Sequence, residues 1–320
     1  MAATGTFARV KALLHFDAGP AVLTLLDRYR STELTVDWCP VGDRGRLATA
    51  LADTDVLFHV LDPVTVTELD LAPRLRLVQK LGVGVNTIDL TAAAARGVAV
   101  ANMPETNTAA AAEHTVALLL AVLRRLPVYH AATAAGRGWA VDAAVGDTTG
   151  EVAGRTVGLV GHGAIARRVE RVLTAMDAIV LHTSRTPDGP SWRPLDELVA
   201  ECDVLSLHVP LTPETTSLLS AERIARMKPG AVVVNTARGG VVDQVALTAA
   251  LQSGHLRGAG LDVFADEPTR GDEAVLSLPN VVVTPHVAWL TVETVDRCLA
   301  VAVENCRRLG AGEELLHRVV

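Results

Sequence analysis

The chain has little of what disulfide scaffolds, zinc modules and nucleic-acid-binding proteins need. Its 320 residues include four cysteines and no C-x-x-C pair, which fits reduced thiols in a cytoplasmic protein better than a disulfide framework or a zinc site. No His–acid spacing such as H-E-x-x-H occurs, so we expect no metal. The net charge of -7 provides no basic field that would attract a nucleic acid.

Long apolar runs are also missing. No run reaches the roughly 18 residues that span a bilayer, and the longest, residues 111–126, contains Glu113 and His114. Asp17 ends the first apolar run too early for a signal-peptide core. We therefore expect a cytoplasmic protein that does not enter a membrane. Hydrophobic residues make up 49% of the chain, which is enough for packed cores, and this length favours two domains.

Short β-branched segments alternate with helical patterns in the second half of the chain. They occupy residues 156–160, 178–182, 204–209, 231–236, 258–264 and 280–286. Segments that are apolar on both faces predict parallel strands covered by helices on both sides. A weaker alternation fills the first hundred residues. We predict an α/β fold with two Rossmann-like domains: a doubly wound parallel-sheet domain, residues 101–289, inserted into a smaller flavodoxin-like domain made of residues 1–100 and a C-terminal helix at 290–320.

A glycine-rich turn follows the first strand of the larger domain. The segment from Gly161 to Ala166 reads G-H-G-A-I-A between a strand and a helix. Gly161 permits the tight turn, Gly163 lets a pyrophosphate approach the backbone, and Ala166 allows close packing of helix and strand. The first helical N–H groups, near Ala164 and Ile165, favour phosphate binding. This context predicts a dinucleotide site.

The end of the next strand bears on the choice of dinucleotide. NAD enzymes place an acid about 20 residues after the turn, but this chain has Thr183, Ser184 and Arg185 there. We predict that Ser184 and Arg185 contact the cofactor, because a guanidinium pairs well with a 2′-phosphate. NADP(H) is favoured and NAD(H) stays open. The alternative is that Arg185 is only a solvated loop residue.

Each of the last three predicted strands is followed by a polar residue in apolar surroundings. These residues are Arg238, Glu267 and His286. Ligands of open α/β sheets bind beyond the carboxyl ends of the strands, so we expect the three side chains to converge. Guanidinium, carboxylate and imidazole together suit the binding of an anion and the transfer of a proton.

Six segments, in this order, carry a resemblance to a known family. They are LGVGVNTIDL, GHGAIA, HVPLTPET, NTARGGVVD, GLDVFADEP and TPHVAW. From about Leu75 to Leu309 the sequence closely resembles the D-isomer-specific 2-hydroxyacid dehydrogenases, nearest the glyoxylate/hydroxypyruvate reductase and glycerate dehydrogenase branch. The resemblance implies an oxidoreductase that reduces a small 2-oxo acid to the D-2-hydroxy acid with NAD(P)H.

The resemblance also implies roles for individual residues. Arg238 would bind the substrate carboxylate and carbonyl, His286 would be the acid/base, and Glu267 its partner. Backbone N–H groups near Val83 and Gly84 would hold the carboxylate from the smaller domain, which would then be the substrate domain. An adjacent carboxylate fixes the tautomer of an imidazole, as such an acid/base requires.

Further implied contacts concern the cofactor and a second copy of the chain. Asp262 would hold the nicotinamide carboxamide. Other cofactor contacts are predicted at His208, Pro210, Thr215 and Ala237. A homodimer is implied through the segment 136–151, which contains Trp139.

Departures from the family pattern leave the substrate and subgroup open. Asn86 replaces a common aspartate, and Glu105 and Asp177 stand where glycine is common. The loop 58–63 has no arginine where phosphoglycerate dehydrogenases hold a phosphate, which favours glyoxylate or hydroxypyruvate. The alternatives are an NAD(P)H-sensing corepressor-like interaction protein and a phosphite or phosphoglycerate-type dehydrogenase. Formate is disfavoured, because formate enzymes have glutamine in place of Glu267.

Overall fold

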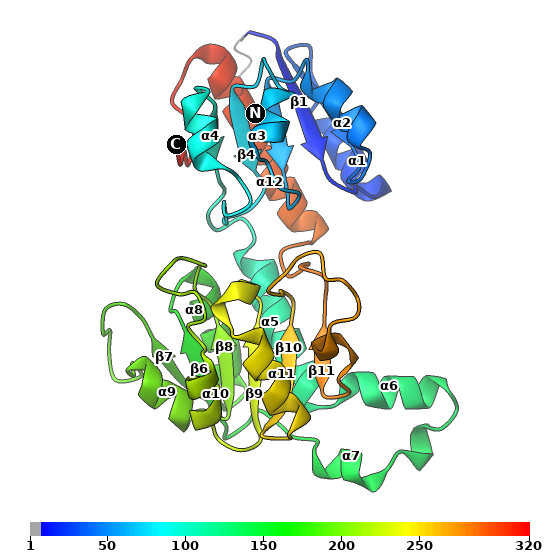
Figure 1. Ribbon diagram of the computed structural model, residues 1–320, viewed down its shortest axis with the longest axis vertical. Coiled ribbons are helices and arrows are strands. Elements are labelled where there is room, and N and C mark those ends of the chain that lie inside the picture. Colours follow the sequence, from blue (N-terminus) through cyan, green and yellow to red (C-terminus); the bar gives the residue numbers. More distant parts are fainter. Residues whose placement is uncertain (1–7) are drawn as a thin grey trace. The chain divides into compact units, whose positions relative to one another are not determined.

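The computed structural model describes residues 8–320, which divide into two compact units. The small unit consists of the chain up to Asn107 together with Leu290–Val320, and the large unit is Thr108–Trp289. Both units are α/β structures (Figure 1). The chain therefore enters the small unit, forms the whole large unit, and returns.

The small unit contains a five-stranded parallel sheet with the order β2-β1-β3-β4-β5. This is the flavodoxin-like order, as predicted. The strands are β1 (Val10–His15), β2 (Leu34–Cys39), β3 (Val56–His59), β4 (Leu77–Lys80) and β5 (Ala99–Ala101). The helices are α1 (Pro20–Arg28), α2 (Arg44–Leu51), α3 (Val66–Asp70), α4 (Leu90–Ala95) and α12 (Val292–Ala311). Every residue of β3 and β4 is buried, as central parallel strands require.

The large unit contains a six-stranded parallel sheet with the order β11-β10-β9-β8-β6-β7. The strands are β6 (Thr156–Val160), β7 (Ile179–Thr183), β8 (Val204–Leu207), β9 (Ala231–Asn235), β10 (Leu256–Leu261) and β11 (Val281–Val283). Since β6 lies between β7 and β8, the strand order reverses there. Open α/β sheets bind ligands beyond the carboxyl ends of the strands at such a point.

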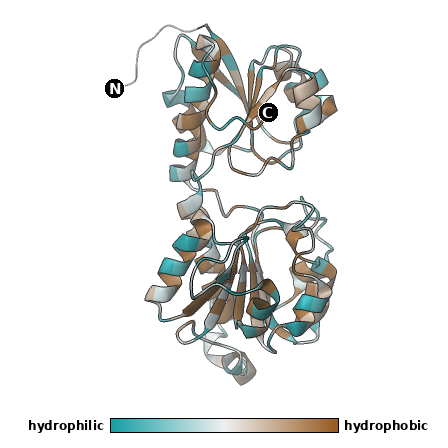
Figure 2. Ribbon diagram, turned by 90° about the vertical axis from the view of Figure 1, so that its left-hand side faces the viewer, coloured by the Kyte–Doolittle hydropathy of each residue, from teal (hydrophilic) through white to brown (hydrophobic). Residues whose placement is uncertain are grey.

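Helices cover both faces of the larger sheet, which confirms the doubly wound prediction. The helices α5 (Thr108–Leu123) and α8 (Ala164–Ala175) share one buried cluster with the strands. The helices α9 (Leu195–Glu201), α10 (Ala221–Arg226) and α11 (Gln244–Gln252) contribute to the other. Figure 2 shows the strands between these layers as largely hydrophobic.

The alanine-rich helix α5 ends at Leu123. Arg125 adopts a left-handed backbone conformation there, and a new helix, α6 (Leu126–Ala134), follows with Pro127 in its first turn. In the described part of the chain no single helix meets the length and apolarity needed to cross a membrane. The pair α5 and α6 meets them together, with a bend of 68° between the two helices.

At two positions where this chain departs from the family pattern, the backbone conformation explains why glycine is common in the family. Glu105 and Asp177 have φ values of 70° and 63°, in the region that glycine adopts freely. A side chain with a Cβ pays about 1–2 kcal/mol for this conformation. The glycine common at both positions in the family is therefore the less strained residue.

We expect Glu105→Gly to raise the free energy of unfolding by about 0.5–1 kcal/mol, because relief of the left-handed strain exceeds the extra chain entropy of glycine. Glu105 is exposed, so little packing is lost. Urea denaturation of the wild type and the variant measures the change. Glu105→Ala keeps the Cβ and should bring no gain; an equal gain in the alanine variant would assign the effect to the side chain.

Candidate functional site

The turn after β6 requires glycine at its first position. Gly161 has φ +93°, and a Cβ there would lie 2.7 Å from the carbonyl oxygen of His208. Its N–H donates to the carbonyl oxygen of Thr183 at 2.9 Å. The turn is therefore held between the carboxyl ends of β7 and β8, and any side chain at Gly161 would push it away from β8.

Gly163 has a different requirement. A Cβ at Gly163 would meet nothing within 4 Å, so packing inside the protein does not demand glycine there. Gly163 is also the N-cap of α8, whose first turn contains no side-chain cap and no acid. The first N–H groups of the helix, near Ala164 and Ile165, are suited to an anion, and Ala166 is fully buried. These features fit the pyrophosphate of a dinucleotide that approaches over Gly163.

The loop after β7 contains an acid that the sequence reasoning missed. Asp188 accepts hydrogen bonds from His182 Nε2 at 2.6 Å and from the Ser184 hydroxyl at 3.3 Å. Hydrogen bonds from His182 and His162 hold the pKa of Asp188 below its usual value. Asp188 lies beyond Thr183 in the chain, so the loop contains a carboxylate although Thr183 itself stands where NAD enzymes place the acid. Arg185 is exposed and forms no ion pair with any described residue.

The last three strands of the large unit lead to the predicted catalytic residues. Arg238 follows β9, Glu267 follows β10, and His286 follows β11. His286 Nδ1 lies 2.6 Å from Glu267 Oε2, and the His286 side chain is 18% exposed. Because Nδ1 is engaged with the carboxylate, Nε2 is the ring nitrogen that can exchange a proton with a ligand.

Arg238, Glu267 and His286 interact electrostatically. Burial alone raises the pKa of Glu267, but the hydrogen bond and positive charge of His286, the Phe264 N–H and the charge of Arg238 outweigh it and lower the pKa. Burial lowers the pKa of Arg238, and Glu267 opposes that change. Glu267 is therefore ionised at neutral pH beside two groups that gain from a negative neighbour.

Two local features fix the conformation of the loop that contains Arg238. The side chain of Asn235 donates to the Arg238 carbonyl oxygen at 2.9 Å and accepts from the Ala237 N–H at 3.0 Å. A Cβ on Gly239 would lie only 1.8 Å from the carbonyl oxygen of Phe264. Glycine therefore allows the Arg238 loop to lie against the loop of Glu267, whose Oε1 accepts from the Phe264 N–H at 2.9 Å.

Asp262 has a structural role that the sequence did not reveal. Its side chain is fully buried, and its carboxylate accepts from the Thr284 hydroxyl at 2.5 Å and from the N–H groups of Val287 and Ala288 at 2.9 and 2.8 Å. Its carbonyl oxygen accepts from the His286 N–H at 2.8 Å. The residue thereby holds the loop in which His286 has φ 56°. The nicotinamide contact predicted for Asp262 stays a prediction.

The remaining predicted cofactor contacts lie at the ends of β8 and β9. Burial lowers the pKa of His208 to about 4, so its ring is neutral, and Nε2 lies 2.9 Å from the Ser206 hydroxyl. The Thr215 hydroxyl donates to the Pro210 carbonyl oxygen at 2.6 Å. Ala237 lies in the Arg238 loop described above. The structure thus places all of these residues beyond the carboxyl ends of the strands in one unit.

The predicted carboxylate-binding residues belong to the other unit. Val83 and Gly84 follow β4 in the small unit. The Asn102 side chain donates to the Val83 carbonyl oxygen at 2.9 Å, which restrains this loop. Their contact with a substrate stays a prediction.

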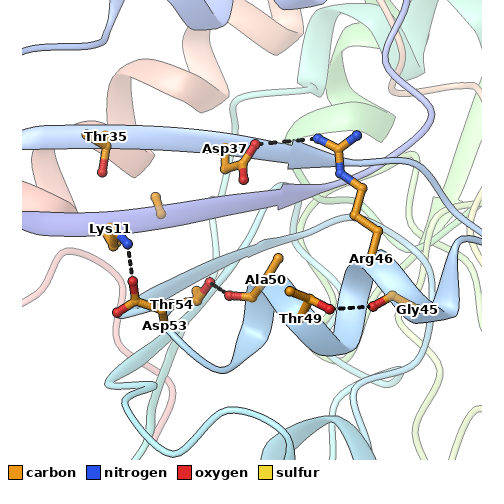
Figure 3. Close-up of a pocket in the computed structure, with 10 residues that line it drawn as sticks. Lys11, Thr35, Asp37, Gly45, Arg46, Thr49, Ala50, Asp53 and Thr54 are labelled. Atoms are coloured by element: carbon orange, nitrogen blue, oxygen red, sulfur yellow. Dashed lines mark hydrogen bonds and ion pairs between the residues drawn. The ribbon is translucent and has the colours of Figure 1, made fainter.

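A pocket of about 460 Å³ in the small unit lies along β1, β2 and α2 (Figure 3). Its charged side chains compensate one another: Lys11 pairs with Asp53, and Arg46 lies 3.6 Å from Asp37. No residue predicted for the site lines it. We therefore place the candidate site at the carboxyl ends of the strands of the large unit.

Comparisons with known proteins identify the family of the large unit. A family model described as "D-isomer specific 2-hydroxyacid dehydrogenase, NAD binding domain" matches residues 116–288. D-3-phosphoglycerate dehydrogenase of Mycobacterium tuberculosis is 40% identical over 289 residues, which are 88% of this chain and 54% of that protein. The chain therefore spans about half the length of this relative.

Two other relatives match over nearly their full length. Glyoxylate reductase of Korarchaeum cryptofilum is 39% identical over 300 residues, 91% of this chain and 90% of that protein. The crystal structure of the NADPH-dependent glyoxylate/hydroxypyruvate reductase of Sinorhizobium meliloti, in complex with NADP and malonate, has a TM-score of 0.80 at 32% identity and covers 98% of this chain and 97% of that one.

Proposed function

The chain belongs to the D-isomer specific 2-hydroxyacid dehydrogenase family, and we propose that it reduces a glyoxylate-like or hydroxypyruvate-like 2-oxo acid to the D-2-hydroxy acid. The observation that carries this proposal is the pair of His286 and an ionised Glu267 at 2.6 Å, together with the partly buried guanidinium of Arg238, whose charge acts on Glu267. That combination can bind a carboxylate and deliver a proton to a neighbouring carbonyl oxygen.

Each side chain has a defined task in the proposed reaction. A reduced nicotinamide supplies the hydride to C2 of the substrate when it is bound. The planar fork of Arg238 engages the substrate carboxylate and its keto oxygen, where negative charge grows. His286 donates its Nε2 proton to that oxygen. Glu267 stabilises the protonated imidazole and keeps its Nδ1 proton in place.

The small unit favours a substrate without a phosphate. The loop 58–63 contains Asp62 and no cation. The nearby Arg44 guanidinium is already compensated, since it lies 3.3 Å from Glu68 and 3.8 Å from Asp62. A phosphate dianion would gain little from this loop. A phosphoglycerate-type activity is the second candidate, because the Mycobacterium tuberculosis relative bears that name.

We further propose that NADP(H) is the preferred cofactor. The exposed Arg185 forms no ion pair with a described residue, and a guanidinium two residues beyond β7 suits a 2′-phosphate. The similar reductase of Sinorhizobium meliloti is named as an NADPH-dependent enzyme. Asp188 in the same loop favours NAD(H) instead, so NAD(H) is the alternative.

Homodimer formation also belongs to the proposal. The helix α6, the 3-10 turn Gly138–Ala140 and the helix α7 (Ala143–Asp147) contain no buried residue. Figure 1 shows them as an arm that extends from the large unit. Trp139 in this arm is 97% exposed. A second copy of the chain would bury that ring, as aromatic residues at interfaces commonly are.

We expect His286→Gln to lower kcat by about 10²–10⁴-fold, because the proton donor for the developing alkoxide is lost. The Kd for the dinucleotide, measured by fluorescence titration, should stay within about threefold of the wild-type value, a difference in binding free energy on the order of RT. His255→Gln, at a partly exposed histidine just before β10, is the matched control and should keep full activity. Comparable kcat in the His286 variant and the control would remove His286 from the mechanism.

We expect Arg185→Ala to weaken NADPH selectively, by about 1.5–3 kcal/mol for a lost charge-assisted contact. NADH should be almost unaffected. Thr183→Asp should shift preference toward NADH, because a carboxylate binds the ribose diol and repels the phosphate. The measurement is kcat/KM for both cofactors at fixed ionic strength. The proposal is contradicted if the wild type prefers NADH and the Arg185→Ala variant has the same ratio of kcat/KM for NADPH and NADH. Arg185 would then be only a solvated loop residue.

We expect Trp139→Ser to shift the protein from dimer to monomer at micromolar concentration, because the exposed ring would anchor the arm on its partner. Sedimentation velocity of wild type and variant measures the change. An unaltered dimer in the variant, or a monomeric wild type, would contradict the role of the arm.

A further inference from the structure

Three arginines gather in the large unit where the arm joins the sheet. Arg125 lies between α5 and α6, Arg155 immediately precedes β6, and Arg257 is the second residue of β10. Each of the three is partly buried. Arg155 and Arg257 lie at the amino ends of their strands, on the edge of the sheet opposite the candidate site. None of the three has a role in the proposed reaction.

A glycine at the end of the arm leaves room for two of the guanidinium groups. A Cβ on Gly150 would lie 2.7 Å from a terminal nitrogen of Arg155 and 2.9 Å from a terminal nitrogen of Arg257. The Gly150 N–H donates to the carbonyl oxygen of Leu123 at 2.8 Å, which ties this glycine to the end of α5. Two positively charged groups therefore reach the same point beside the backbone of Gly150.

The three charges act on one another. Burial lowers the pKa of Arg257, and the positive charges of Arg155 and Arg125 lower it further. No carboxylate of the described residues forms an ion pair with any of the three. Guanidinium groups nevertheless stay protonated in proteins. A chain with a net charge of -7 thus concentrates positive charge at this one place.

Several donors of these arginines have no acceptor. Arg155 Nε donates to the carbonyl oxygen of Glu151 at 2.5 Å, but its terminal nitrogens and the Arg257 guanidinium donate to no described residue. Arg125 Nε is buried and has no hydrogen-bond partner. Buried donors are normally satisfied, so the group of arginines is incomplete without a further acceptor.

Asp203 does not fill this role, because its two oxygens are already engaged. They accept from Lys228 Nζ at 3.0 Å and from the Thr156 N–H at 2.8 Å. Burial raises the pKa of Asp203, but these hydrogen bonds and the charges of Lys228 and Arg155 outweigh it and lower the pKa. Arg155 is the smallest of these causes, so Asp203 compensates its charge only weakly.

We propose that Arg125, Arg155 and Arg257 bind a phosphate group, free or as part of a small molecule. The planar guanidinium fork pairs with phosphate oxygens through two parallel hydrogen bonds. A phosphate offers at least three acceptor oxygens and nearly two negative charges, whereas a carboxylate offers two oxygens and one charge. Three converging guanidinium groups match the phosphate better.

The bound phosphate would join both ends of the arm to the sheet. Arg125 precedes the arm, Gly150 follows it, and Arg155 and Arg257 belong to β6 and β10 or adjoin them. Because the unfolded chain does not hold these residues together, phosphate binds the folded state preferentially and stabilises it. The ligand would thereby restrain the arm through which dimer formation is proposed.

The test uses full-length, tag-free protein without cofactor or substrate, so its outcome does not depend on the proposed reaction. Inorganic phosphate and glycerol 3-phosphate are titrated by calorimetry, and Tm is measured in phosphate and in chloride at equal ionic strength. We expect saturable binding and a higher Tm in phosphate. Tighter binding of the ester would identify a phosphate-bearing small molecule as the ligand, and equal binding would identify the phosphate group alone.

Two variants separate this site from the nucleotide turn, which both of them retain. Arg257→Gln should weaken phosphate by about 10–100-fold, as expected for loss of one charge-assisted hydrogen bond. Gly150→Ala keeps every charge but places a Cβ where the nitrogens converge, and should also weaken phosphate. Gly150 lies outside the left-handed region, so its backbone accepts alanine. Arg171→Gln, at an exposed position on α8, is the matched control and should bind like the wild type.

The Tm in chloride distinguishes a ligand site from a structural role. Without phosphate, Arg257→Gln should unfold at the same Tm as the wild type or a higher one, because one of three like charges is removed. The proposal is overturned if both variants bind phosphate as tightly as the control. It is also overturned if Arg257→Gln lowers Tm in chloride or dissociates a dimer there, since a carboxylate of this chain or of a second copy would then be the partner of Arg257.

Discussion

The geometry of the candidate site depends on the buried carboxylate of Asp262. It has no exposed surface, yet it remains a good hydrogen-bond acceptor because three donors, from Thr284, Val287 and Ala288, surround it. Hydrogen bonds to a charged group contribute about 1.5–3 kcal/mol each. They exceed the roughly 1–2 kcal/mol that His286 loses in its left-handed conformation. Strain at His286 is thus offset by the hydrogen bonds of Asp262.

From this anchor the site extends outward through neighbouring loops. His114 on α5 lies 2.9 Å from the Thr284 hydroxyl, so a helix on one face of the sheet supports the same loop. The Arg238 and Glu267 loops lie in backbone contact at Gly239. The carboxylate of Glu267 in turn lies 2.6 Å from His286 Nδ1. A change of conformation in any one loop would alter the separation of the three groups.

Much of this arrangement could be predicted from the sequence. Parallel strands buried on both faces leave continuous apolar runs, so the strands were placed to within a few residues, and β6 at its observed bounds. The glycine turn was predicted from the needs of close backbone approach, and Gly161 shows that need directly. The convergence of Glu267 and His286 followed from the rule that strand ends share an edge.

Other features depend on distances that the sequence does not encode locally. Asp188 was missed because the expected acid was sought by counting from the glycines, whereas the loop after β7 folds back onto His182. His162 contacts Glu170 and Asp188, which lie 8 and 26 positions away, and these spacings match no helical or strand period. Pro127 indicates that a helix ends near Leu123, but the apolar pattern of α5 continues into α6 and hides this end in the sequence.

The measurement that tests the account most directly is turnover of a panel of 2-oxo acids by the purified chain, followed by the absorbance of the reduced cofactor. The panel contains glyoxylate, hydroxypyruvate, pyruvate and phosphohydroxypyruvate, each with NADPH and with NADH, and phosphite is assayed in the oxidative direction. The account predicts that glyoxylate or hydroxypyruvate has the highest kcat/KM and that hydroxypyruvate yields D-glycerate. Tight dinucleotide binding with no oxidation by any 2-oxo acid would contradict it and favour a nucleotide sensor.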